Sequence, residues 1–391
     1  MAQPKNLAYV KPDLLVWARQ EAGYTVEAAA KRIQVSTEKL LECEAGNDNL
    51  TFNQLRNLGN VYKRPLAFFY LPAPPKTDFA LQDFRRFTDE SEHSLSPALR
   101  LEVRKAKGRR GLALDMLEEL ELTPAVFDAA ASTEESVEAI ARRIRELLNV
   151  SFDAQARLKT DYEALRFWRG VIEARGVLVF QASIKKSEMR GFSMWYSPLP
   201  VIVVNAKDAP YGRVFTMIHE IAHLLLRSGG LCDLGEDKIE VFCNAVAGET
   251  LVPSEMLLQD RLVRENRDST VWSDVTLAAL AGRFSVSREV ILRRLLTLDR
   301  TTQEFYRQKR TEWMQAFEAL QTKNKESSGF VPQHVKALAA VGPTFATWVL
   351  DCYRQERISP TDAAQYFGVK IKHLSEIEKA VRIPYLTSEA A

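Results

Sequence analysis

The segment His219-Glu220-Ile221-Ala222-His223 combines two imidazoles and one carboxylate at a spacing suited to metal chemistry. Histidines four residues apart on a helix project from one face, about one turn apart, so both can reach the same ion. Glu220 can then reach a metal-bound water rather than the metal itself. This is the HExxH arrangement of zinc hydrolases, in which the glutamate acts as general base. We therefore predict a Zn²⁺ site with His219 and His223 as ligands and Glu220 as the catalytic residue.

A catalytic zinc requires a third protein ligand and one open position for water. Glu240 lies on the next expected helix, which begins near Lys238, and a short loop that folds this helix back would bring its carboxylate to the metal. We predict Glu240 as the third ligand, because a helix holds a ligand more rigidly than a glycine-flanked loop. The competing candidates all lie in or next to the loop: Cys232, Asp233, Glu236 and Asp237.

Attack on a peptide carbonyl also requires a donor that stabilises the oxyanion. Four residues could supply it or contact the substrate, and the sequence does not distinguish them: Tyr196, Tyr211, Arg213 and Asn244. The run Val201 to Val204 predicts a strand that either pairs with an extended substrate or lies buried inside a sheet. The sequence favours neither interpretation.

The elements that must position these residues are mostly helical. Residues 96–175 and 213–318 have helical periodicity and are rich in helix-forming residues. Between them, three short β-branched and aromatic runs predict a small sheet: 176–180, 192–196 and 200–204. The predicted fold class is therefore α+β and mostly α, with a small sheet beside the HExxH helix.

Two stretches of the chain have the composition of boundaries: the proline cluster at 72–75 and the polar run at 322–329. They divide the chain into parts with separate helical patterns. We predict four parts: a helical helix-turn-helix domain at 8–72, a helical connector at 73–170, a peptidase domain at 171–322 and a C-terminal helical unit at 331–391.

A pattern of Ala, Val and Leu or Ile at five-residue intervals occurs three times, beginning at Ala30, Ala281 and Ala364. In a helix-turn-helix, the small residue lets the helices approach, the Val anchors the turn, and the third residue seats the second helix. The pattern predicts a helix-turn-helix in the N-terminal domain and similar units further on. Candidate contacts to DNA or to a partner are Ser36, Thr37 and Lys39.

Charge limits the DNA-binding interpretation. The chain has 53 Lys and Arg against 51 Asp and Glu, and residues 11–63 contain seven of each sign. Phosphate contacts supply most non-specific affinity, so a neutral domain gains little. Two other segments, 100–110 and 283–294, are more basic, and we interpret them as solvated helical faces. Surface or capping positions are expected for the remaining histidines, His93, His334 and His373.

Composition excludes several classes of protein. Hydrophobic residues make up 46% and charged residues 27% of the chain, which is typical of globular domains rather than disordered or fibrous ones. The four cysteines show no CxxC spacing, so neither a disulfide framework nor an all-cysteine zinc site is predicted. Without a signal-peptide core or a run of about 18 apolar residues, we expect a cytoplasmic protein with no membrane segment.

The motif region resembles the ImmA/IrrE metallopeptidases. The family pattern is a strand ending in Asn, then HExxH, then E-x-x-x-N leading to Leu-x-Pro. It is matched by VIVVNAKDAPYGRVFTMIHEIAHLLL and IEVFCNAVAGETLVP, with Asn205, Glu240, Asn244 and Leu251-Val252-Pro253 at the key positions. Mild departures are Cys243, where Ala is usual, and Val246-Ala247-Gly248, where a Phe-Ala-Ala run is usual. Residues 14–71 are similar to the Xre-type helix-turn-helix at the amino end of longer members.

The resemblance implies a zincin-like domain with Zn²⁺ bound by His219, His223 and Glu240, and Glu220 as general base. It also implies a regulatory endopeptidase that cleaves a specific protein, such as a transcriptional repressor, under stress. The expected partners are that repressor, a co-encoded regulator or a toxin, with DNA as a further partner through the helix-turn-helix. The alternative is a DNA- or toxin-binding regulator of antitoxin type, in which the peptidase domain is a conditional switch or a binding platform.

Overall fold

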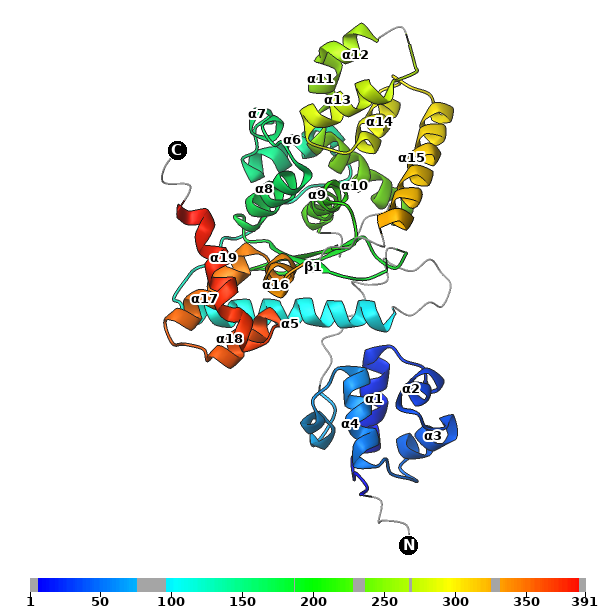
Figure 1. The fold of residues 1–391 in the computed structure, drawn as a ribbon, viewed down its shortest axis with the longest axis vertical. Helices are drawn as coiled ribbons and strands as arrows, with labels where there is room; N and C mark the ends of the chain where they lie inside the picture. The colour runs from blue at the N-terminus through cyan, green and yellow to red at the C-terminus, as the bar shows by residue number, and fades with distance from the viewer. Residues whose placement is uncertain are drawn as a thin grey trace. The chain divides into compact units, whose positions relative to one another are not determined.

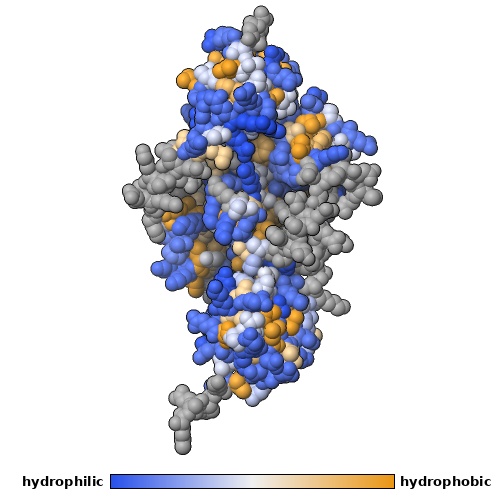
Figure 2. Space-filling model, turned by 90° about the vertical axis from the view of Figure 1, so that its right-hand side faces the viewer, coloured by the Kyte–Doolittle hydropathy of each residue, from blue (hydrophilic) through white to orange (hydrophobic). Residues whose placement is uncertain are grey.

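The computed structural model describes residues 6–75, 96–185, 187–227, 236–266, 269–324 and 331–386. The chain divides into two compact units, Met1–Lys107 and Gly108–Ala391, and the boundary falls within helix α5 (Pro97–Glu119). The four-part division made from the sequence stays a prediction. No described helix is both long and apolar enough to cross a membrane. On the face drawn in Figure 2, hydrophilic residues dominate and apolar ones are scattered among them.

Unit 1 is helical, and three of its helices begin directly after a hydroxyl residue that caps them. Hydroxyl oxygens of Thr25, Ser36 and Thr51 each accept a hydrogen bond from a backbone N–H three residues further on. A three-residue turn joins α2 to α3 at the first Ala-Val-Leu pattern. The elements are α1 (Pro12–Ala22), α2 (Val26–Ile33), α3 (Thr37–Ala45), α4 (Phe52–Tyr62) and the 3-10 helix η1 (Leu66–Tyr70).

Unit 2 is built on a three-stranded sheet of β1 (Leu178–Ala182), β2 (Gly191–Met194) and β3 (Val201–Asn205). The strand order is β1-β3-β2, with β1 parallel and β2 antiparallel to β3. The mostly helical fold with one small sheet confirms the predicted class. Because β3 is paired on both sides and fully buried, it is the buried interior strand, and the substrate-pairing interpretation of residues 201–204 is wrong.

Helices cover both faces of this sheet (Figure 1). On one side, α8 (Asp161–Glu173), α9 (Pro210–Leu226) and α10 (Glu236–Leu251) share one apolar core with the strands. On the other, α17 (Pro343–Arg354) places Phe345 5.8 Å from the Phe180 ring of β1, measured between centroids. The core also includes α6 (Val137–Leu148), α7 (Phe152–Ala156), α11 (Ser254–Gln259), α12 (Arg261–Glu265), α13 (Asp274–Phe284), α14 (Arg288–Thr297) and α15 (Gln303–Asn324).

The two edges of the sheet differ in accessibility. All five residues of β1 are buried, and the Val179 carbonyl on its outer side accepts a hydrogen bond from Arg169 of α8. Along β2, burial alternates, and Gly191 and Ser193 are partly accessible. The β1 edge is therefore closed, whereas no strand among the described residues pairs with the outer side of β2, which we call the open edge.

The closed edge of the sheet depends on the C-terminal helical unit, which is the last part of unit 2. This unit comprises α16 (Gln333–Val341), α17, α18 (Pro360–Phe367), η3 (Ile371–His373) and α19 (Leu374–Leu386). A buried ion pair of α8, Arg169 Nε to Glu173 Oε1 at 2.8 Å, holds the turn between α16 and α17. Arg169 Nη1 donates to the Ala339 carbonyl at 2.7 Å, and Glu173 Oε2 accepts from the Thr344 N–H at 2.9 Å.

Gly342, between those two contacts, has a φ of 86°. A Cβ there would lie 2.3 Å from Arg169 Nη2 and 2.5 Å from Glu173 Oε1, so only glycine fits. Elsewhere in this unit, His334 and His373 lie 3.1 and 3.2 Å from the same Glu376 oxygen, while His93 lies outside the described residues.

The basic segments match the predicted solvated faces only in part: Arg283, Arg288 and Arg293 are exposed, but other arginines are enclosed by the fold. In the first, Arg104 donates to the Tyr62 carbonyl, and burial lowers the pKa of this guanidinium to about 10. Arg110 donates to the Leu199 carbonyl at 3.0 Å. In the second, Arg294 is only 4% exposed. Neither pattern could reveal these contacts, because the acceptors lie far away in the sequence.

Candidate metal centre

Helix α9 brings the HExxH residues into the core. Pro210 occupies its first turn, where a missing N–H costs nothing, and apolar residues surround it on most sides. Its polar residues are correspondingly enclosed: Glu220 is 6% and His223 8% exposed, and the side chain of His219 is 12% exposed. Buried polar groups need partners, and the next helix supplies one.

Helix α10 packs beside α9, as the predicted fold-back requires. Its apolar stripe faces the core, with Cys243 and Val246 fully buried and Phe242 partly so. Glu240 lies off this stripe, and its side chain is half exposed while both carboxylate oxygens reach the α9 histidines. The packing of the apolar stripe against the core thus fixes the rotation of α10 that directs Glu240 toward the histidines.

Three donor groups converge on one point. His219 Nε2 lies 3.0 Å from His223 Nε2, and the two Glu240 oxygens lie 3.3 Å from His219 Nε2 and 3.0 Å from His223 Nε2. A tetrahedral zinc with bonds of about 2.0–2.1 Å separates its ligand atoms by roughly 3.3 Å. The donor types and their spacing therefore fit a zinc ion. Among the described residues, no other group of three or more His, Cys, Asp or Glu side chains lies close enough together to share an ion.

The charges of the site favour a cation. Hydrogen bonds from His219 and His223 hold the pKa of the Glu240 carboxyl far below its usual range. Burial by itself lowers the pKa of His219, but its hydrogen bond to Glu240 and the nearby Glu220 and Asn244 raise it overall. Two carboxylates, of Glu220 and Glu240, thus lie near His219 and provide surroundings that attract a positive charge.

Gly191 is a site residue that the sequence interpretation missed. It begins β2 and lies directly against α9, since a Cβ there would be 2.3 Å from Thr216 Cγ2 and 3.3 Å from Glu220 Oε1. A third contact, 3.1 Å from the Val203 carbonyl, closes the remaining space. A glycine heading a short aromatic strand is the only signal for this role that the sequence contains.

Asn205 fixes where β2 begins. Its side-chain amide donates to the carbonyls of Ile184 and Met189 at 3.1 and 2.8 Å, and its oxygen accepts from the Lys207 N–H. These bonds tie the connection between β1 and β2 to the end of β3. The strand-end Asn of the family pattern therefore positions Gly191 beside Glu220 rather than reaching the metal ligands.

Of the four predicted oxyanion or substrate contacts, only Asn244 is shown beside a metal ligand, interacting with His219. The Tyr196 ring lies under the Arg110 guanidinium at 4.1 Å, and its hydroxyl contacts Met194 Sδ. Arg213 is buried and donates to Gln181 of β1 at 2.7 Å. Burial raises the pKa of Tyr211, with added effects from Asp161 and Glu163 of α8.

The competing ligands are not described: Cys232 and Asp233 lie outside the described residues, and the side chains of Glu236 and Asp237 do as well. The DNA or partner candidates are described in unit 1. Ser36 caps α3, Thr37 is partly buried, and Lys39 forms an ion pair with Asp48.

A buried helix that presents two metal-donating histidines and a carboxylate beside an open sheet edge is typical of a metal-dependent peptidase. Residues 172–296 match the family model Peptidase_M78, described as an IrrE N-terminal-like domain. The match supports the ImmA/IrrE resemblance and a metallopeptidase-like function for this segment, which contains the three donors and Glu220. No curated protein matches the chain.

Proposed function

We propose that the chain is a zinc-dependent endopeptidase with a regulatory role in the cytoplasm, cleaving a specific protein such as a transcriptional repressor. The observation that carries this proposal is the convergence of His219, His223 and Glu240 beside the buried Glu220. The match of residues 172–296 to a peptidase family supports the reaction class. The regulatory substrate rests on the resemblance to ImmA/IrrE proteins.

In the proposed peptide hydrolysis, the zinc ion and the side chains of the protein have separate roles. When bound, zinc lowers the pKa of its water toward about 7 and polarises the peptide carbonyl. Glu220 accepts the proton from the attacking water and then delivers it to the leaving amine. Asn244, near His219, is the best placed of the predicted donors to stabilise the developing oxyanion.

The open edge of β2 is the proposed binding track for the substrate. The Asn205 N–H donates to the Arg190 carbonyl at 2.8 Å, so by the alternation of an antiparallel ladder Gly191 and Ser193 direct their backbone groups away from β3. An extended peptide can pair with these groups while its backbone passes Glu220. An extended loop, a terminus or a locally unfolded segment of a protein substrate can adopt this conformation.

Metal binding is the first test of this function. We expect one zinc per purified chain by elemental analysis, and less than about a tenth of that in His219→Ala, which loses a ligand of the ion. Chelation should abolish cleavage of co-encoded regulators, and added zinc should restore it. A wild-type chain that binds no zinc, or that cleaves equally well after chelation, would contradict the proposal.

Gly191→Ala tests the contact between β2 and Glu220. The added methyl must displace Thr216 or the strand, so we expect about a 10-fold to 100-fold loss of kcat with zinc content unchanged. Gly282→Ala is the matched control, because a Cβ there meets nothing within 4 Å. Equal steady-state rates for the two variants would show that the close contact of Gly191 with Thr216 and Glu220 does not matter for catalysis.

The alternative, a DNA- or toxin-binding regulator, depends on unit 1. Its α3 exposes Glu38, Glu42 and the apolar Leu41, while Lys39 is paired with Asp48. We propose that this surface contacts protein. In mobility-shift assays with duplex DNA at about 0.15 M salt, about 10 µM protein should cause no retardation. Retardation that weakens steeply with salt would favour the DNA-binding version.

A further inference from the structure

The metal-ligand helix α10 is held at the end opposite Glu240. Its last carbonyl groups have no partners within the helix, and side chains from three other elements satisfy them. The Thr250 carbonyl accepts from Arg145 Nη1 at 2.8 Å and the Leu251 carbonyl from Gln155 Nε2 at 2.8 Å. The next carbonyl, of Val252, accepts from Arg294 Nε at 3.1 Å.

Arg294 makes the largest set of these contacts. It forms an ion pair with Glu249 of α10, and the two side chains are only 5% and 8% exposed. Its Nη2 also lies 3.1 Å from Ser254 Oγ, which in turn donates to Glu249. Because both charges are buried, each depends on the other for its stability.

Arg294 passes close to the backbone of α10 at Gly248, where no side chain intervenes. A Cβ at Gly248 would lie 3.1 Å from Arg294 Cδ, which is tighter than an ordinary contact.

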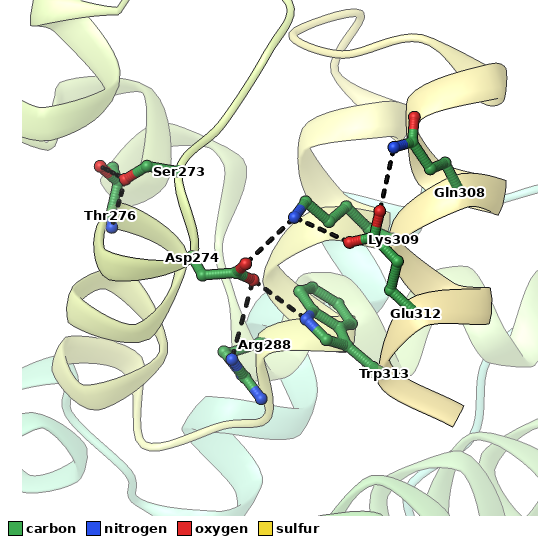
Figure 3. A network of polar contacts seen from close by, with 8 residues as sticks. All are labelled: Ser273, Asp274, Thr276, Arg288, Gln308, Lys309, Glu312 and Trp313. Atoms are coloured by element: carbon green, nitrogen blue, oxygen red, sulfur yellow. Dashed lines mark hydrogen bonds and ion pairs between the residues drawn. The ribbon is translucent and has the colours of Figure 1, made fainter. Parts of the chain in front are cut away.

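Arg294 is the buried arginine of α14, the second helix of the Ala281 pattern, whereas Arg288 and Arg293 of α14 and Arg283 of α13 are exposed but still have partners within the chain. Arg283 pairs with Asp260 at 2.6 Å, and Arg293 stacks over Tyr306 at 5.5 Å. Figure 3 shows the remaining one: Arg288 reaches Asp274, which also accepts from Lys309 and Trp313 of α15. The arginines of α14 thus link this helix to α10 through Glu249, to α13 through Asp274 and to α15 through Tyr306.

We propose that Arg294 is a positioning residue for the metal centre, and that α13, α14 and α15 together fix the helix that carries Glu240. Glu249 lies nine residues after Glu240, about 13.5 Å along a rigid helix, so a shift at one end moves the other. Direct hydrogen-bond partners of metal ligands commonly change metal affinity by about 10-fold to 100-fold, and for Arg294, which acts through the helix, we expect the lower end of that range. The proposal rests on the zinc site of the proposed function.

The test compares neighbouring arginines in the full-length chain. Arg294→Lys keeps the charge but loses the fork that reaches Glu249 and Val252 together. We expect it to raise the Kd for Zn²⁺ about 10-fold in competition with a chromophoric chelator, and to alter the visible spectrum of the Co²⁺ form. Arg293→Lys, whose side chain stacks on Tyr306, should change the Kd less than about 2-fold.

A folded Arg294→Lys variant with wild-type Kd and Co²⁺ spectrum would overturn the proposal. If that variant does not fold, Gly248→Ala presses on the same contact and should raise the Kd in the same direction; an unchanged Kd would again overturn it. Zinc binding without peptide cleavage by the wild-type chain refutes only the proposed peptidase. Absence of zinc binding by the wild-type chain refutes both.

Discussion

Replacing Glu220 with Gln should lower peptide hydrolysis by about 10³-fold, equivalent to about 4 kcal/mol in the activation barrier, without loss of zinc. The amide keeps the size of the carboxylate but cannot take a proton from water. Because Glu220 is 6% exposed and lies against Gly191, no bulk water replaces its function easily. Steady-state kcat with the identified substrate is the measurement.

The controls for this variant separate chemistry from binding. Zinc content should equal that of the wild-type chain, since Glu220 is outside the three-donor group. Substrate affinity should also persist, so Glu220→Gln is suited to trapping the bound protein. Unchanged kcat would show that another group carries the proton, and a loss of zinc would mean that Glu220 supports the ligands instead.

The second large effect concerns the Arg169–Glu173 pair. Arg169→Met leaves the Glu173 carboxylate without its ionic partner at a position where its side chain is 2% exposed. Removal of one partner from a buried pair costs about 3–5 kcal/mol, a large share of the total stability of an ordinary domain. We expect the midpoint of urea unfolding to fall accordingly and proteolysis near the α16–α17 turn to accelerate.

Arg166→Met is the matched control, because this arginine lies on the same helix and is exposed. The double variant Arg169→Met/Glu173→Met should lose less stability than Arg169→Met alone, since no unpaired charge remains. Equal unfolding midpoints for Arg169→Met and the wild-type chain would show that the pair contributes little.

The convergence of His219, His223 and Glu240 could be predicted from the sequence because its geometry is mostly local. A spacing of four residues fixes His219 and His223 on one helical face, whatever surrounds that helix. Glu240 required only one further assumption, that the next helix folds back. The role of residues 201–204 could not be predicted in this way, because their neighbours depend on strand order.

Contacts between distant segments account for what was missed. Gly191 matters only because β2 passes close to Glu220, and nothing in its own neighbourhood encodes that approach. Arg294 looks in the sequence like one more member of the exposed basic face of 283–294, and only the fold brings it to its buried partner Glu249. Repeats of one local pattern can therefore serve different purposes, since burial and partners are set elsewhere.

The closed edge of the sheet has a consequence for how the chain acquires its structure during synthesis. The pair that covers β1 is completed only when Ala339 and Thr344 reach it, more than 150 residues after the strand has been made. Until then, the nascent chain has two unpaired strand edges, and such edges favour association with other chains. The segment 172–296 that matches the peptidase family lacks Arg169 and the α16–α17 turn. The segment that matches the family model therefore does not contain the contacts that close the β1 edge.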